Sequence, residues 1–100
     1  MIRFQRSGRI ARGKDLQATE WSKEVTAYLN SKFSDANLQV FSQRFGDIDT
    51  LAWQADFDSL ASLDNYQRAI NGDEGFWERL GKSTEFFVEG SFFDTVFETL

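Results

Sequence analysis

Residues 85–100 read Glu-Phe-Phe-Val-Glu-Gly-Ser-Phe-Phe-Asp-Thr-Val-Phe-Glu-Thr-Leu, and this stretch decides the fold. A strand with one face in solvent alternates apolar and polar residues, but here both sets of positions carry large apolar side chains. They are Phe86, Val88, Phe92, Val96 and Leu100 at even positions, and Phe87, Phe93 and Phe97 at odd positions. The pattern predicts a final strand that needs cover on both faces. A second layer of the same chain or a partner subunit can supply that cover, and we favour the partner.

The rest of the chain alternates strand and helix patterns. Strands are predicted at residues 2–10, 38–45 and 50–57, and helices at residues 16–33 and from residue 60 onward, with a short continuation over residues 73–82 after Asn71-Gly72. With the final strand, the order is βαββαβ, a ferredoxin-like α+β arrangement with an antiparallel sheet. Right-handed crossovers place both helices on one face of that sheet, so the other face is left bare.

The composition narrows the function classes. A chain of 100 residues predicts a single domain over residues 1–100. Cys and His are both absent, so we expect no metal and no cofactor. The net charge of −5 argues against nucleic acid and anionic membranes as partners. No apolar run reaches membrane-span length, and the N-terminus lacks a signal-peptide pattern, so a cytoplasmic location is expected.

Two further stretches carry a resemblance to known proteins. Leu51-Ala52-Trp53-Gln54-Ala55-Asp56-Phe57-Asp58-Ser59-Leu60 and Asp73-Glu74-Gly75-Phe76-Trp77, together with the element order, resemble the dimeric α+β barrel superfamily over the whole chain. That superfamily includes NIPSNAP-type and antibiotic-biosynthesis-monooxygenase-type domains. The two ends of the chain look most similar to a small bacterial branch with no assigned function. The resemblance implies a homodimer in which two sheets pack face to face and the final strand reaches over the partner.

Five residues of the final strand are therefore candidates for the dimer interface: Phe87, Phe92, Phe93, Val96 and Phe97. Gly90-Ser91 predicts a bend in this strand. We expect residues 85–90 to pair within the subunit and residues 91–100 to lie against the partner.

A ligand pocket between the sheet and the helices is the second implication of the resemblance. Trp53 lies on the apolar face of its predicted strand, and Tyr28, Tyr66 and Trp77 can line the same space. The alternative, which we favour, is that these aromatic residues form ordinary core packing. Four polar candidates for a barrel or pocket are Gln5, Gln54, Asp56 and Arg44, although pairing with each other or with solvent explains them more simply.

Two functions follow. The first is a homodimeric module that binds a small apolar or aromatic molecule or takes part in an interaction. The alternative is a cofactor-independent monooxygenase, or a related enzyme, acting on an aromatic substrate. A closed pocket with a buried carboxylate or a tyrosine pair beside Trp53 would favour the enzyme. Haem degradation, known among superfamily members, uses a histidine that this chain lacks.

Overall fold

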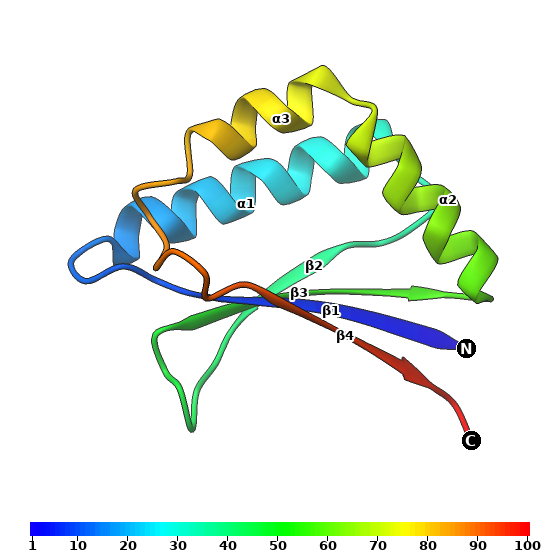
Figure 1. The fold of residues 1–100 in the computed structure, drawn as a ribbon, viewed down its shortest axis with the longest axis horizontal. Coiled ribbons are helices and arrows are strands. Elements are labelled where there is room, and N and C mark those ends of the chain that lie inside the picture. Colours follow the sequence, from blue (N-terminus) through cyan, green and yellow to red (C-terminus); the bar gives the residue numbers. More distant parts are fainter.

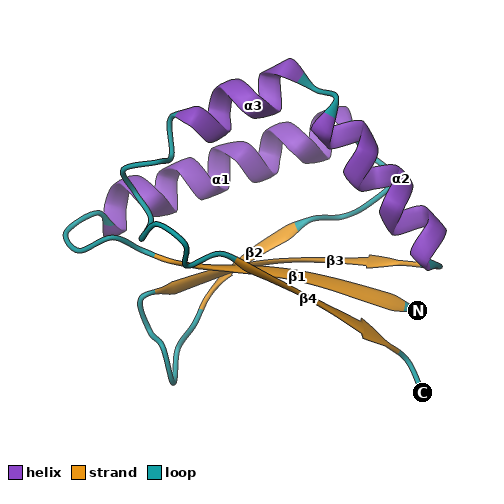
Figure 2. Cartoon of the chain, in the orientation of Figure 1, coloured by secondary structure: helices purple, strands orange, loops and turns teal.

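The protein is described by a computed structural model that covers residues 1–100. Three helices lie on one side of a four-stranded sheet, and no element covers the other side (Figure 1 and Figure 2). In chain order the elements are β1 (Ile2–Arg9), α1 (Asp15–Lys32), β2 (Gln39–Ser42), β3 (Thr50–Phe57), α2 (Leu60–Asn71), α3 (Glu74–Gly81) and β4 (Phe93–Glu98). The predicted ferredoxin-like α+β order is confirmed, with the second helix divided into α2 and α3.

The sheet has the strand order β2-β3-β1-β4, and every neighbouring pair is antiparallel. Because paired residues share a face, the register assigns the two faces. Ile2 pairs with Phe57 and Phe4 with Ala55, and these buried residues face the helices. The intervening pairs, such as Gln5 with Gln54, face away from them. We call this second side the open face.

Local sequence signals fix the two C-terminal helices. The Ser59 side chain caps α2 by accepting a hydrogen bond from the Ser62 amide, and Asp73 caps α3 by accepting one from the Phe76 amide. In α2 the buried residues Leu63, Tyr66 and Ile70 recur at helical spacing and pack toward the sheet. α3 begins shortly after α2 ends, and both helices border the same side of the core.

The prediction of one strand over residues 85–100 is wrong. Residues 86–88 make only a short pairing with residues 9–11, including a single bridge between Phe87 and Ile10. A turn follows, in which Gly90 has φ of +75° and the Ser91 amide donates to the Val88 carbonyl. Only then does β4 begin, and it pairs with β1 of the same chain rather than lying free for a partner.

Two of the five predicted interface residues lie on the helix-facing side of the sheet: Phe92 stacks on Trp53, and Val96 pairs with Phe4 of β1. Phe87 also differs from its predicted place at a subunit interface. It is buried in the core of its own chain, where its ring packs edge-on against Trp21 and lies 6.0 Å from that of Trp53. The doubly apolar pattern therefore arises in part because the chain crosses one end of the core, not because one strand is covered on both sides.

β4 is nevertheless unusually bare. None of its six residues is buried, and Phe93 and Phe97 on the open face are 61% and 52% exposed. Phe41 of β2 adds a third exposed ring to this face. A strand with this many exposed aromatic rings lacks the cover that such side chains normally have in a monomer.

Candidate functional site

A cleft of about 620 Å³ lies between the helices and the helix-facing side of the sheet. Twelve of its sixteen lining residues are hydrophobic, so its walls suit an apolar molecule. The sheet side contributes Phe4, Arg6, Trp53, Phe92 and Asp94, and Phe93 borders the cleft although it has the parity of the open face. The helix side contributes Trp21, Val25 and Leu29 of α1, Tyr66, Gln67, Ile70 and Asn71 of α2, and Phe76 and Leu80 of α3, with Leu38 before β2.

An aromatic cluster surrounds Trp53 at one end of the cleft. The Trp53 ring is stacked with Phe92, with centroids 6.2 Å apart and planes at 28°, and meets Trp21 edge-on. Phe87 touches both Trp53 and Phe92 from the core. Stacked and edge-on pairs of this kind add to the burial energy of the rings, so the cluster forms an aromatic wall at this end of the cleft.

Two lining residues carry buried polar atoms without a hydrogen-bond partner. They are the indole Nε1 of Trp53 and the hydroxyl of Tyr66. Burial raises the pKa of Tyr66 to about 12, so its hydroxyl stays protonated at neutral pH. The indole N–H can only donate, and a protonated phenol donates readily. Both groups are therefore hydrogen-bond donors without an acceptor in this chain.

The charged residues of the cleft form one ion pair. Arg6 on β1 and Asp94 on β4 are cross-strand neighbours, and Nε and Nη2 of Arg6 donate to the two carboxylate oxygens at 2.7 and 2.9 Å. The hydrogen bonds that Arg6 donates to Asp94 raise the pKa of the guanidinium. Because both side chains are half-exposed and mutually satisfied, the pair gives the cleft a polar border without a free charge.

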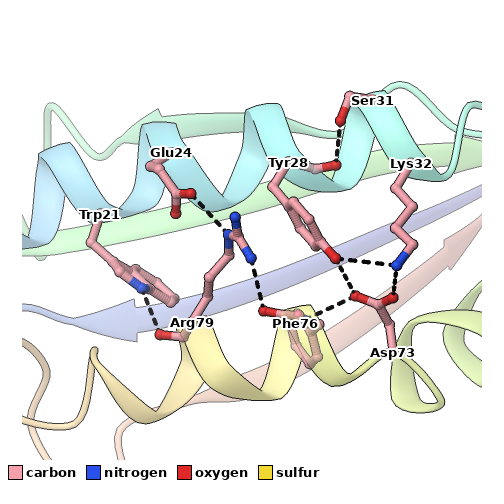
Figure 3. A network of polar contacts seen from close by, with 9 residues as sticks. Trp21, Glu24, Tyr28, Ser31, Lys32, Asp73, Phe76 and Arg79 are labelled. Carbon is pink, nitrogen blue, oxygen red and sulfur yellow. Dashed lines mark hydrogen bonds and ion pairs between the residues drawn. The ribbon is translucent and has the colours of Figure 1, made fainter.

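A polar network holds α3 against α1 (Figure 3). The Tyr28 hydroxyl donates to Asp73 at 2.6 Å, and Lys32 forms an ion pair with the same carboxylate. Further along α3, the Arg79 guanidinium lies 3.7 Å from the centre of the Tyr28 ring and binds Glu24. The Trp21 indole donates to the Arg79 carbonyl. This network positions α3, whose Phe76 and Leu80 close one side of the cleft.

The structure places only two of the predicted pocket residues in the cleft and distributes the others elsewhere. Trp53 and Tyr66 line the cleft, whereas Tyr28 belongs to the polar network and Trp77 lies on the outside of α3, 52% exposed. Three of the polar candidates lie on the open face: Gln54 donates to Gln5 at 2.8 Å, and Asp56 binds Arg3. Arg44 lies in the exposed loop after β2.

Some lining residues carried no functional signal in the sequence. Arg6 is not among the predicted site residues, although it shares the parity of Ile2 and Phe4 and so faces the helices. That parity was the available signal. Nothing in the sequence indicates that Asp94, 88 residues away, is its partner.

Two further features of the structure bear on the function classes. No three acidic, His or Cys side chains come together in a group that could hold a metal ion. None of the three helices combines the length and the apolar character of a membrane span.

Comparisons with known proteins identify the fold. No protein-family model and no curated protein matches the sequence. Among solved structures, an uncharacterised NIPSNAP domain protein from Burkholderia xenovorans superposes with a TM-score of 0.83 at 12% identity, covering 100% of this chain and 95% of that one. A NIPSNAP family protein from Agrobacterium tumefaciens gives 0.81 at 13%, covering 99% and 92%. An antibiotic biosynthesis monooxygenase gives 0.72 at 10%, covering 100% and 99%.

These similarities establish the architecture. The chain has the ferredoxin-like α+β fold that NIPSNAP-domain proteins and antibiotic-biosynthesis-monooxygenase-type proteins share, as the sequence resemblance implied. At 10–13% identity they establish nothing about a reaction.

Proposed function

We propose that this chain is a homodimeric module that binds a small apolar or aromatic molecule in the cleft between its helices and its sheet. The observation that carries this proposal is the cleft itself. Its volume of about 620 Å³ lies within the range of roughly 300–1,000 Å³ that is typical of small-molecule sites. Its apolar walls and its two unpartnered polar atoms, on Trp53 and Tyr66, suit a ring-bearing molecule with a hydrogen-bond acceptor.

The dimer part of the proposal is supported by the open face. Phe41, Phe93 and Phe97 lie exposed there, and no helix of the same chain reaches that side of the sheet. Gln5 and Gln54, which are hydrogen-bonded to each other, lie in the row of the open face between those of Phe93 and Phe97. A second copy of the same face would bury the rings of both subunits, and each Phe contributes about 1.5–3 kcal/mol when fully buried.

Cofactor-free oxygenation is the alternative, and the cleft supports it less. Such a reaction needs a group that accepts a proton from the substrate. The only carboxylate that lines the cleft is Asp94, and Arg6 already binds both of its oxygens. Tyr66, with its raised pKa, is a donor rather than a base. No tyrosine pair lies beside Trp53, because Tyr28 belongs to the network between α1 and α3.

Binding can be tested through the three tryptophan indole N–H signals in a ¹H–¹⁵N NMR spectrum. Trp21 and Trp53 line the cleft, whereas Trp77 lies outside it, where its indole donates to the Asn71 carbonyl. We expect titration with 2-naphthol to shift the Trp53 and Trp21 signals in a saturable way and to leave the Trp77 signal in place.

The individual signals can be assigned with the variants Trp21→Phe, Trp53→Phe and Trp77→Phe. If 2-naphthol shifts none of the signals, or shifts that of Trp77 as strongly as the others, binding in the cleft is contradicted. A monomeric protein would contradict the dimer without bearing on the cleft.

A further inference from the structure

We propose that Phe92 occupies the ring-binding position on Trp53 while the cleft is empty, and that a bound aromatic ligand displaces it. This inference rests on the proposed function, because it concerns the same cleft. It adds that the chain carries its own competing ring. This ring lowers the apparent affinity of the cleft and favours a planar aromatic ligand.

The first observation is where the Phe92 ring lies. It is stacked on Trp53, with centroids 6.2 Å apart, and it touches Phe87, with centroids 5.0 Å apart. Phe92 and Trp53 both line the cleft. A planar ligand that enters the cleft would find the face of the Trp53 indole already occupied by a phenyl ring.

The second observation is what lies beneath that ring. Phe92 rests on Gly8 of β1, so closely that a Cβ atom at position 8 would lie 2.5 Å from Cε1 and 2.8 Å from Cδ1 of Phe92. The register of β1 makes Gly8 part of the helix-facing side, opposite Leu51. The absence of a side chain at Gly8 therefore leaves a recess in the sheet, and the recess holds one aromatic ring.

The third observation is how loosely Phe92 is held. The other aromatic residues around it lie in strands or helices or are buried, whereas Phe92 lies in the irregular segment before β4 and is 42% exposed. None of the backbone hydrogen bonds outside helices and strands involves Phe92. Of the rings packed on Trp53, it is the one that can leave without breaking backbone structure or opening the core.

Together these features define an aromatic recess made by Gly8 and Trp53, with Phe92 as its resident. Because the displacement of Phe92 costs free energy, a ligand binds with lower apparent affinity than it would bind to an open recess. The chemistry favours a planar aromatic ring, because the vacated place is flat, lies against an indole face and is bounded by Phe87.

Two substitutions at position 92 separate a competing ring from a simple wall of the cleft. The dissociation constant of 2-naphthol is measured on the full chain in solution from the shift of the Trp53 indole signal. For Phe92→Ala we expect binding about threefold to tenfold tighter, the equivalent of one lost stacking contact. For Phe92→Trp, whose larger ring fills the recess more completely, we expect binding at least about threefold weaker.

Phe45→Ala is the matched control, because Phe45 is 87% exposed in the β2–β3 loop. The affinity of this variant for 2-naphthol should equal that of the unchanged protein.

The outcomes are distinct. Tighter binding by Phe92→Ala together with weaker binding by Phe92→Trp supports the competing ring. Unchanged or weaker binding by Phe92→Ala overturns it, since Phe92 would then be a wall that the ligand uses, while the binding function itself would stand. If neither the unchanged protein nor any variant binds 2-naphthol, the proposed function and this inference fail together.

Discussion

Gly75, in the first turn of α3, lies against the hydroxyl group of Tyr28. A Cβ atom at this position would lie 2.8 Å from Cζ of Tyr28 and closer still to its hydroxyl oxygen. Alanine normally stabilises a helix relative to glycine by about 1 kcal/mol. Here we expect Gly75→Ala to lower the free energy of unfolding by about 1–3 kcal/mol, because the methyl group pushes Tyr28 away from Asp73. Urea denaturation followed by circular dichroism measures the change.

Gly81, at the other end of α3, supplies the matched control. A Cβ atom there would meet nothing within 4 Å. We therefore expect Gly81→Ala to leave stability unchanged or to raise it by up to about 1 kcal/mol. Equal losses for the two variants would contradict the contact between Gly75 and Tyr28.

Trp53 is the largest side chain of the sheet core, and only 7% of it is exposed. Truncation to alanine removes its contacts with Trp21, Phe87 and Phe92 at once. We expect Trp53→Ala to cost about 3–5 kcal/mol of unfolding free energy in urea denaturation, as for other large core truncations. Trp77→Ala, on the exposed side of α3, should cost clearly less. A Trp53→Ala protein of unchanged stability would mean that Trp53 does not face the helices.

The position of an individual residue could be predicted where strand alternation or helical spacing determines which face it occupies. Trp53 follows from the alternation of Leu51, Trp53, Ala55 and Phe57, and Tyr66 from its spacing with Leu63 and Ile70. Tyr28 has equally good helical spacing, yet its hydroxyl binds Asp73, 45 residues further along the chain. Periodicity indicates which face of a helix a residue occupies but not which polar group it binds. The sequence therefore could not show that Tyr28 binds Asp73 whereas Tyr66 lines the cleft.

Among the elements, α3 depends on one buried carboxylate. Asp73 caps the helix through the Phe76 amide, and hydrogen bonds from Lys32 and Tyr28 hold the pKa of its carboxyl below the ordinary value of 3.8. The unfolded chain therefore takes up a proton at higher pH than the folded protein does. The stability that Asp73 contributes is present above about pH 4 and is lost as the pH falls through its lower folded-state pKa.

We expect Asp73→Asn to reduce stability at pH 7 and to flatten the loss of stability between pH 5 and about pH 2, because the asparagine cap no longer titrates. Denaturation midpoints across this pH range measure both effects. Asp64→Asn is the control, since Asp64 pairs with Arg68 on the exposed surface of α2. A variant at position 73 with the same pH slope as the unchanged protein would contradict the role given to this carboxylate.

The segment before β4 shows where sequence patterns stop being informative about elements. Apolar residues at both parities of residues 85–100 imitate a strand covered on both sides. In the structure Phe87 enters the core, Gly90 turns the chain with a positive φ, and only residues 93–98 form a strand. Two short apolar segments separated by a turn give the same composition as one long strand. The glycine was visible in the sequence, but the direction in which the chain leaves it was not.

At the scale of the whole molecule, the order of elements and the bare sheet face were predictable, because handed crossovers leave few alternatives once strands and helices are assigned. The cleft was less predictable. Its volume depends on how α2 and α3 are set above the sheet, and that setting depends on contacts between residues far apart in the sequence, such as Trp21 with Arg79.

The bare face leads to a prediction for the assembly. We expect the double variant Phe93→Asp with Phe97→Asp to weaken self-association by at least about a hundredfold, because it places two charges where the proposed interface buries two rings. The matched control is Leu16→Asp with Leu60→Asp, which adds the same charges at exposed apolar positions on the helix side. Equal effects of the two double variants would show that the open face has no special part in association.

Sedimentation equilibrium of the intact, tag-free chain at micromolar concentration tests most directly whether the open face is a subunit interface. We expect a single species of twice the chain mass of 11.5 kDa, because Phe41, Phe93 and Phe97 have no cover within the chain. A monodisperse monomer of 11.5 kDa would contradict the interface and, with it, the homodimer proposed from the exposed aromatic residues of the open face.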